Sequence, residues 1–194
     1  MSKSHMLFFV YGASGSGKST LLNMINELSS EISIHRKDTT RKLRPLEKPE
    51  TNKEIRFKRK LKAEDYVLVY EQFKNQYGIR KDLLTKSFEN HKIHFVIIGN
   101  IDALKKMKKM YPYAIVLYVH YSPNEIPKHF LERDSLEFKK RKEKIIVQYE
   151  DYIKHNTFFD HVILNFWKLE TARQQLKNII NIYNKEFEFD ILNK

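Results

Sequence analysis

The chain is organised around residues 12–20, which read Gly12-Ala13-Ser14-Gly15-Ser16-Gly17-Lys18-Ser19-Thr20. This stretch fits the pattern G-x-x-x-x-G-K-[ST], a glycine-rich loop that cradles phosphate groups and is called a P-loop. The apolar and aromatic run 6–11 contains no breaker and predicts a buried strand before the loop. Behind the loop, apolar residues from Leu21 to Leu28 recur at helical spacing. A strand, a glycine-rich turn and a helix form the context in which a P-loop works.

The residue types in this loop suit the binding of ATP. Glycines let the backbone approach the phosphates and point N–H groups at them, and the helix that begins near Gly17 adds its positive end. Lys18 is expected to reach the β- and γ-phosphates, and the hydroxyl of Ser19 to ligate Mg²⁺. A glycine-rich turn without a ligand is the alternative, and the flanking strand and helix argue against it. The predicted ATP-binding residues are Gly12, Ala13, Ser14, Gly15, Ser16, Gly17, Lys18, Ser19 and Thr20, with Ser19 as the metal ligand.

Length and composition predict one globular domain over residues 1–194, because 41% of the residues are hydrophobic. The absence of cysteine excludes disulfides and thiolate metal sites. No apolar run approaches the roughly 20 residues that span a bilayer, and no signal-peptide pattern precedes the P-loop. Together with the implied use of ATP, these features predict a cytoplasmic protein without a membrane partner.

The formal charge of +12 predicts an anionic partner. Nucleic acid and polyphosphate substrates both require basic sites. The basic segment 36–62 contains a single aromatic residue, Phe57, so base stacking has little support there. We therefore expect a small nucleotide or sugar phosphate as the partner rather than nucleic acid.

Strand-like runs alternate with helical patterns, which is typical of a parallel sheet covered by helices. The predicted fold class is α/β, the three-layer α/β/α fold of P-loop NTPases with a parallel central sheet. The core is expected at about 5–35 and 91–183, a small acceptor-binding insert at about 36–90 and a charged lid at about 132–144. Strands are predicted at 31–35, 66–70, 93–98, 114–120 and 161–164, and helices at 81–90, 103–110 and 169–183, with a basic loop and short edge strands over 36–62.

The end of the chain alternates strictly between acidic and apolar residues from Glu186 to Ile191. This pattern fits an added edge strand or a contact between two copies of the chain. A frayed terminus is an equal alternative. A homodimer is therefore one expected partner arrangement.

A second phosphate-binding cluster follows the strand at 31–35. It reads Thr39-Thr40-Arg41-Lys42-Leu43-Arg44-Pro45. Two guanidinium groups three residues apart suit bidentate binding of a phosphate. Because ligands of open parallel sheets bind beyond the carboxyl ends of the strands, this cluster is expected beside the P-loop. The pair predicts a phosphate donor and a phosphate-bearing acceptor, with a solvated basic loop as the alternative.

At this point the sequence resembles the guanylate kinase family. The family joins a P-loop, a T-T-R-x-x-R-x-x-E segment, a Y-G dipeptide, an aspartate after a central strand, an arginine-bearing lid and a late F-D-x-V-I-x-N strand. The resemblance runs in order to about residue 183. This chain carries Gly12 to Ser19, Thr39-Thr40-Arg41 with Arg44 and Glu47, Tyr77-Gly78, Asp102, Arg133 and Arg141, and Phe159-Asp160-His161-Val162-Ile163-Leu164-Asn165.

The resemblance implies a phosphotransferase that moves the γ-phosphoryl group of ATP to a nucleoside monophosphate, GMP first, with Mg²⁺. It implies acceptor binding by Arg41, Arg44 and Tyr77, and base recognition near Glu71 and Asp102. The implied catalytic residues are Lys18, Arg41, Arg133 and Arg141, where the two lid arginines would neutralise the transferring group.

Four positions depart from the family pattern: Lys37 replaces a serine, Ile55 a tyrosine, Ile79 a serine or threonine, and Leu46 a glycine. The phosphate-binding residues are mostly retained, while the residues that read the base are partly lost. A pocket that hydrogen-bonds a base selects through those polar groups, so GMP selectivity is an open question.

Two alternatives stay open. Tyr77-Gly78-Ile79, together with Tyr111-Pro112, is also similar to ribose 1,5-bisphosphate phosphokinase, a sugar-phosphate kinase of the same fold family. Guanylate kinase-like domains also serve as non-catalytic binding modules. Such modules usually lose the P-loop, which is complete here.

Overall fold

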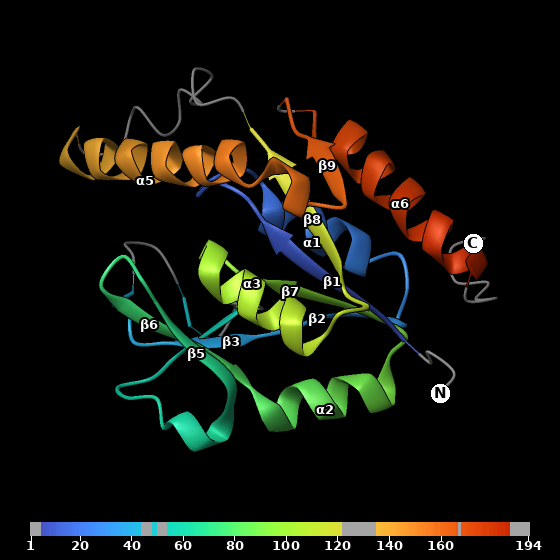
Figure 1. The fold of residues 1–194 in the computed structure, drawn as a ribbon, viewed down its shortest axis with the longest axis horizontal. Helices are drawn as coiled ribbons and strands as arrows, with labels where there is room; N and C mark the ends of the chain where they lie inside the picture. The colour runs from blue at the N-terminus through green and yellow to red at the C-terminus, as the bar shows by residue number, and fades with distance from the viewer. Residues whose placement is uncertain (1–4, 44–47, 50–53, 122–134, 167, 187–194) are drawn as a thin grey trace.

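The computed structural model describes residues 5–43, 48–49, 54–121, 135–166 and 168–186. The chain forms three layers, with helices on both faces of a central sheet (Figure 1). The sheet has five strands in the order β2-β7-β1-β8-β9, and every neighbouring pair is parallel. The strands are β1 (Met6–Tyr11), β2 (Ile32–Ile34), β7 (Ile93–Ile97), β8 (Ile115–His120) and β9 (His161–Leu164). The predicted α/β class is therefore confirmed.

The two faces of β1 explain the layers. All six of its residues are buried, and side chains of a strand alternate between faces. Phe8 and Val10 pack in one core with α1 (Lys18–Asn26) and α6 (Leu169–Glu186). Leu7 and Phe9 pack in the other core with α3 (Ile101–Met110). A continuous apolar strand is thus buried from both sides, as parallel sheets require.

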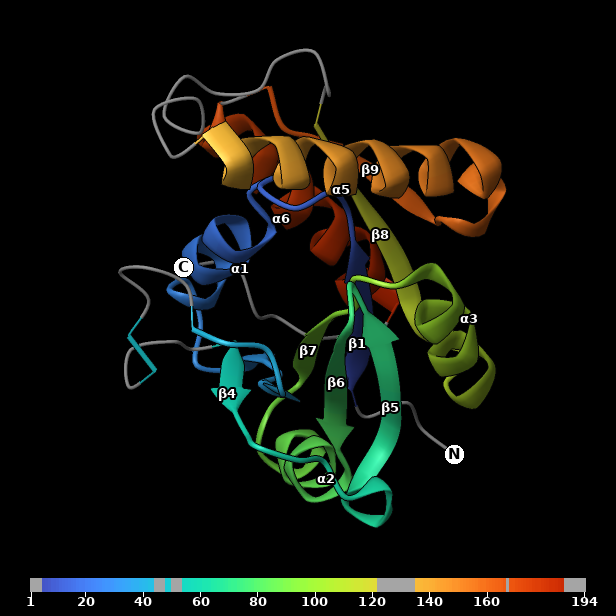
Figure 2. The same cartoon turned by 90° about the vertical axis from the view of Figure 1, so that its left-hand side faces the viewer.

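Between β2 and β7 the chain forms a second sheet of four strands, in the order β4-β3-β6-β5. Its strands β3 and β4 pair in parallel, while β6 is antiparallel to both β3 and β5. The strands are β3 (Lys37–Thr39), β4 (Ile55–Phe57), β5 (Tyr66–Gln72) and β6 (Asn75–Arg80), and α2 (Lys81–Asn90) leads back to the central sheet. Figure 2 shows the β5–β6 hairpin in front of β1, below the long helix α5 (Ser135–Lys154).

The hairpin is the main element that the sequence did not predict. Its two turn residues, Phe73 and Lys74, have φ angles of 50° and 61°. Such angles are typical of tight hairpin turns that the sequence usually marks with Asn-Gly or Asp-Gly. Phe73-Lys74 carries no such mark. Strand β6, which contains the Tyr77-Gly78 pair, was therefore not predicted as a strand.

Most other elements agree with the predictions. Helix α2 and strand β9 have the predicted ends, and α3 begins two residues earlier than predicted. The basic segment 36–62 contains two short strands, β3 and β4, of which β4 is the edge strand that the alternation at Ile55 and Phe57 predicted. No helix in the described part of the chain is long and apolar enough to cross a bilayer. Residues 135–144 of the predicted lid form the first half of α5, while residues 132–134 and the alternating tail after Glu186 lie outside the described residues.

Candidate functional site

The P-loop joins β1 to α1 and requires glycine at two points. Gly12 has a φ of 149°, and a Cβ there would lie 2.6 Å from the carbonyl oxygen of Val119. Gly17 has a φ of 83°, and its Cβ would lie 2.5 Å from Nδ2 of Asn165. That amide donates a 2.8 Å hydrogen bond to the carbonyl oxygen of Ser16. Asn165, the last residue of the late F-D-x-V-I-x-N motif, therefore packs against the P-loop at Gly17 and stabilises it through this hydrogen bond.

Lys18 begins α1 and lies over the loop. Its ammonium donates hydrogen bonds to the carbonyl oxygens of Gly12 (2.8 Å) and Ala13 (2.6 Å). Burial, followed by repulsion from Lys37, lowers the pKa of Lys18 to about 7, while attraction to Glu54 opposes the shift. A negatively charged group that binds at the loop would therefore raise the pKa of Lys18 and favour its protonated form.

Ser19 connects the P-loop to the insert. Its hydroxyl donates a 2.7 Å hydrogen bond to Oε2 of Glu54, which directly precedes β4. A hydroxyl and a carboxylate are hard oxygen donors of the kind that Mg²⁺ accepts beside phosphate oxygens and water. Within the described residues no group of three histidine, cysteine or acidic side chains forms a metal site. The pair of Ser19 and Glu54 could hold a magnesium ion, and Glu54 was missed by the sequence analysis.

The P-loop and the insert line one cavity of about 850 Å³. Its wall contains Lys18 and Ser19 from the P-loop side, and Arg41 and Tyr77 from the insert. The two predicted phosphate sites thus open into the same space. Arg44, the second guanidinium of the acceptor cluster, lies outside the described residues.

Arg41 is held in place from several sides. It is 9% exposed, and its backbone N–H donates to Oγ1 of Thr39 over 3.2 Å. Its guanidinium lies 4.9 Å from the ring centre of Phe57 and donates a 3.0 Å hydrogen bond to the carbonyl oxygen of Lys42. Contact with an aromatic ring and a backbone hydrogen bond restrict the guanidinium, and a positioned guanidinium suits bidentate recognition of a phosphate.

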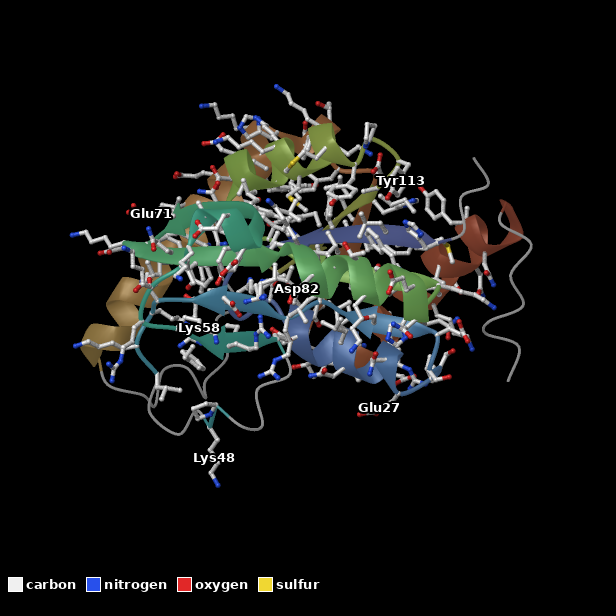
Figure 3. All side chains as sticks on the ribbon, turned by 90° about the horizontal axis from the view of Figure 1, so that it is seen from below. Glu27, Lys48, Lys58, Glu71, Asp82 and Tyr113 are labelled. Carbon is white, nitrogen blue, oxygen red and sulfur yellow. The ribbon has the colours of Figure 1, made fainter. Side chains whose placement is uncertain are left out.

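The hairpin register decides which side chains face the cavity. Tyr70 pairs with Tyr77 and Gln72 with Asn75, so these four side chains share one face of the hairpin. Gln72, Asn75 and Tyr77 line the cavity. Glu71 pairs with Gln76 on the opposite face and is exposed (labelled in Figure 3). The side chain of Glu71 is therefore outside the cavity lining, and the structure gives no support to its implied role in reading a base.

Beyond the cavity, the same face of the hairpin packs into the core of the central sheet. Leu68 pairs with Ile79 on this face, and Ile79 is fully buried. Asp102, the other residue implied to lie near a base, is exposed in the first turn of α3 and is absent from the cavity wall. Neither acidic residue thus belongs to the cavity wall in this structure.

Helix α5 supplies two cavity residues that the sequence analysis missed. Gln148 accepts a 2.8 Å hydrogen bond from the backbone N–H of Ser14 and donates one of 3.1 Å to the carbonyl oxygen of Gly99. Lys144 lies with its Nζ 4.7 Å from the ring centre of Phe73, at the hairpin tip. The predicted lid residue Arg133 and the side chain of Arg141 lie outside the described part of the chain.

Comparisons with known proteins agree with this architecture. A guanylate kinase from Hydrogenovibrio crunogenus is 27% identical over 182 residues, which cover 89% of this chain and 85% of that protein. Among solved structures, a guanylate kinase from Anaplasma phagocytophilum aligns with a TM-score of 0.63 at 19% identity, covering 93% of this chain and 87% of its own. A shikimate kinase from Bacteroides thetaiotaomicron aligns with a TM-score of 0.50 at 14% identity, over 91% and 98% of the two chains.

The two solved structures show the fold, and the family assignment comes from the sequence. The family model described as guanylate kinase matches residues 4–183, which include the P-loop, the insert and the late strand β9 with Asn165. The chain therefore belongs to the guanylate kinase family.

Proposed function

We propose that this protein transfers the γ-phosphoryl group of ATP to a phosphate group of a nucleoside monophosphate, and that GMP is the first acceptor to test. The observation that carries the proposal is the single cavity lined by Lys18 on one side and by Arg41 and Tyr77 on the other. Use of ATP is consistent with the predicted cytoplasmic location.

The proposed reaction needs no nucleophilic side chain. An oxygen of the acceptor's phosphate forms a bond to the γ-phosphorus, the bond from that phosphorus to the β–γ bridging oxygen breaks, and ADP leaves with the electron pair. Lys18 would hold the β- and γ-phosphates, and Arg41 the acceptor's phosphate. Ser19 and Glu54 would hold Mg²⁺, which would neutralise charge on the phosphates when it is bound.

A sugar phosphate is the second candidate acceptor. The absence of Glu71 and Asp102 from the cavity wall favours it, because these are the residues that the family resemblance assigns to reading a base. The exposed position of Glu71 points the same way. Ribose 1,5-bisphosphate represents this class in the test below.

The test is an acceptor panel with ATP and Mg²⁺. Purified protein is given each nucleoside monophosphate or ribose 1,5-bisphosphate, and acceptor-dependent formation of ADP is measured. The proposal predicts one preferred acceptor, and loss of the signal in the Lys18→Ala variant. ATP binding by calorimetry without any acceptor-dependent ADP would instead support a non-catalytic nucleotide-binding module.

A further inference from the structure

Lys37 is a buried lysine in the wall of the cavity. It begins β3, is 8% exposed, and stands where the family pattern has a serine. Lysine is rarely buried unless its charge is matched. A lysine at this place therefore calls for a chemical reason.

Its contacts match only part of its charge. The ammonium donates a 3.0 Å hydrogen bond to the carbonyl oxygen of Ile97 and lies 5.5 Å from the ring centre of Tyr77. An ammonium has three N–H donors, and in the described part of the chain Lys37 Nζ donates this one hydrogen bond. Because a buried cation without full pairing costs free energy, the remaining donors favour an anion in the cavity.

Lys37 lines the same cavity as Lys18 and Arg41 and interacts electrostatically with both. Repulsion from its charge lowers the pKa of Lys18, and repulsion from Arg41 acts on Lys37 in turn. Burial is the largest cause that lowers the pKa of Lys37 to about 8, and attraction to Glu54 opposes it. The ammonium is therefore an electrostatic neighbour of the P-loop lysine and of the acceptor arginine at once.

We propose that Lys37 binds the phosphate of the acceptor together with Arg41, on the side that faces the γ-phosphoryl group of ATP. This inference rests on the proposed function, and it assigns to the replaced serine position a phosphate contact in place of a contact to a base. The ligand is a phosphate monoester dianion, whatever group that monoester carries.

The experiment measures equilibrium binding by calorimetry, separately for Mg-ATP and for the preferred acceptor or, failing one, for each member of the panel and inorganic phosphate. Lys37→Met removes the ammonium and keeps most of the stem, while Lys37→Arg keeps a positive charge. Lys58→Met is the matched control, since Lys58 is an exposed lysine of the same insert outside the cavity wall (labelled in Figure 3). Thermal melting of each variant checks folding, and Lys37→Gln replaces Lys37→Met if the latter does not fold.

The inference predicts that Lys37→Met weakens acceptor binding by about tenfold to a hundredfold, the loss expected for a hydrogen bond to a charged group. Mg-ATP binding is expected to stay within about threefold, Lys37→Arg to keep part of the affinity, and Lys58→Met to match the wild type. Unchanged acceptor affinity in Lys37→Met would overturn the inference, and so would an equal loss of Mg-ATP affinity.

The outcomes separate this inference from the proposed function. If the wild type binds an acceptor through Lys37 but forms no acceptor-dependent ADP, the phosphotransfer proposal fails and the Lys37 site stands. If the wild type forms ADP with an acceptor and Lys37→Met retains its acceptor affinity, the phosphotransfer proposal stands and the Lys37 site fails. If the wild type binds neither an acceptor nor inorganic phosphate, both fail.

Discussion

The two halves of the cavity are built in different ways. The half proposed to bind the donor, called the donor half, comes from one continuous loop, residues 12–20, whose backbone geometry depends on glycines at positions 12 and 17. The half proposed to bind the acceptor, called the acceptor half, comes from side chains that are far apart in the sequence and meet through the second sheet, among them Lys37, Arg41 and Tyr77. Backbone amides bind any triphosphate in the same way, whereas side chains can be exchanged one at a time.

Under the proposed function, this difference would let a chain of this fold keep its donor and change its acceptor. The P-loop is complete, while the insert carries Lys37 and Ile79 in place of polar residues of the family pattern. Both substituted positions lie in the second sheet, so neither alters the path of the P-loop. Variants in the two halves should therefore affect different substrates.

The largest effect is expected in the donor half. Lys18→Ala removes the ammonium that lies over the loop, and we expect kcat to fall by about 10² to 10³, as for the loss of one preorganised charge-stabilising group. Steady-state kinetics with saturating acceptor measures this, with the melting temperature as the folding control. Activity equal to that of the wild type would break the assignment of the donor half.

Arg41→Lys tests the acceptor half with its charge preserved. A lysine has neither the planar fork nor the stacking on Phe57, so kcat/KM for the acceptor should fall by about 10², while KM for ATP stays the same. The comparison of the two KM values is the measurement. A parallel rise in both would mean that Arg41 serves the whole cavity and that the halves are not separable.

Glu54→Gln tests the contact between the halves. The neutral amide is a weaker partner for a hydrated Mg²⁺, and we expect the concentration of Mg²⁺ for half-maximal activity to rise by about tenfold. Calorimetric binding of Mg-ADP gives a second readout that does not depend on turnover. The same Mg²⁺ dependence in variant and wild type would leave Glu54 with a structural role in joining Ser19 to the insert.

The smallest effect is expected at Glu71. Because this carboxylate is exposed on the far face of the hairpin, Glu71→Gln should change KM for the acceptor by no more than about twofold. Its neighbour Gln72 donates a hydrogen bond to the carbonyl oxygen of Gly99 at the cavity wall, and Gln72→Ala should raise KM for the acceptor. The opposite ranking of the two variants would show that the hairpin presents its other face to the substrate.

The donor half could be predicted from the sequence because its signals are local. A buried strand, a spaced set of glycines and a helix follow one another within residues 6–28, and each is readable by itself. The same holds for α2 and β9, which are short, periodic and bounded by polar residues.

The acceptor half could be predicted only in part. Arg41 and Tyr77 were identified through a motif, and both line the cavity. The side chains that accompany them depend on strand register, in which a shift of one residue moves a side chain to the other face. Gln72 rather than Glu71 faces the cavity for this reason. The register could not be predicted, because the turn at Phe73-Lys74 lacks the residues that usually mark a hairpin.

The most direct test of a shared cavity is a linked inhibitor, in which adenosine and the preferred acceptor are joined through a chain of phosphates. If both sites open into one space, this compound should compete with ATP and with the acceptor, and bind at least about 10²-fold more tightly than either substrate. If it competes with ATP alone and the acceptor still binds to the inhibited protein, the two phosphate sites do not share a cavity and the account is contradicted.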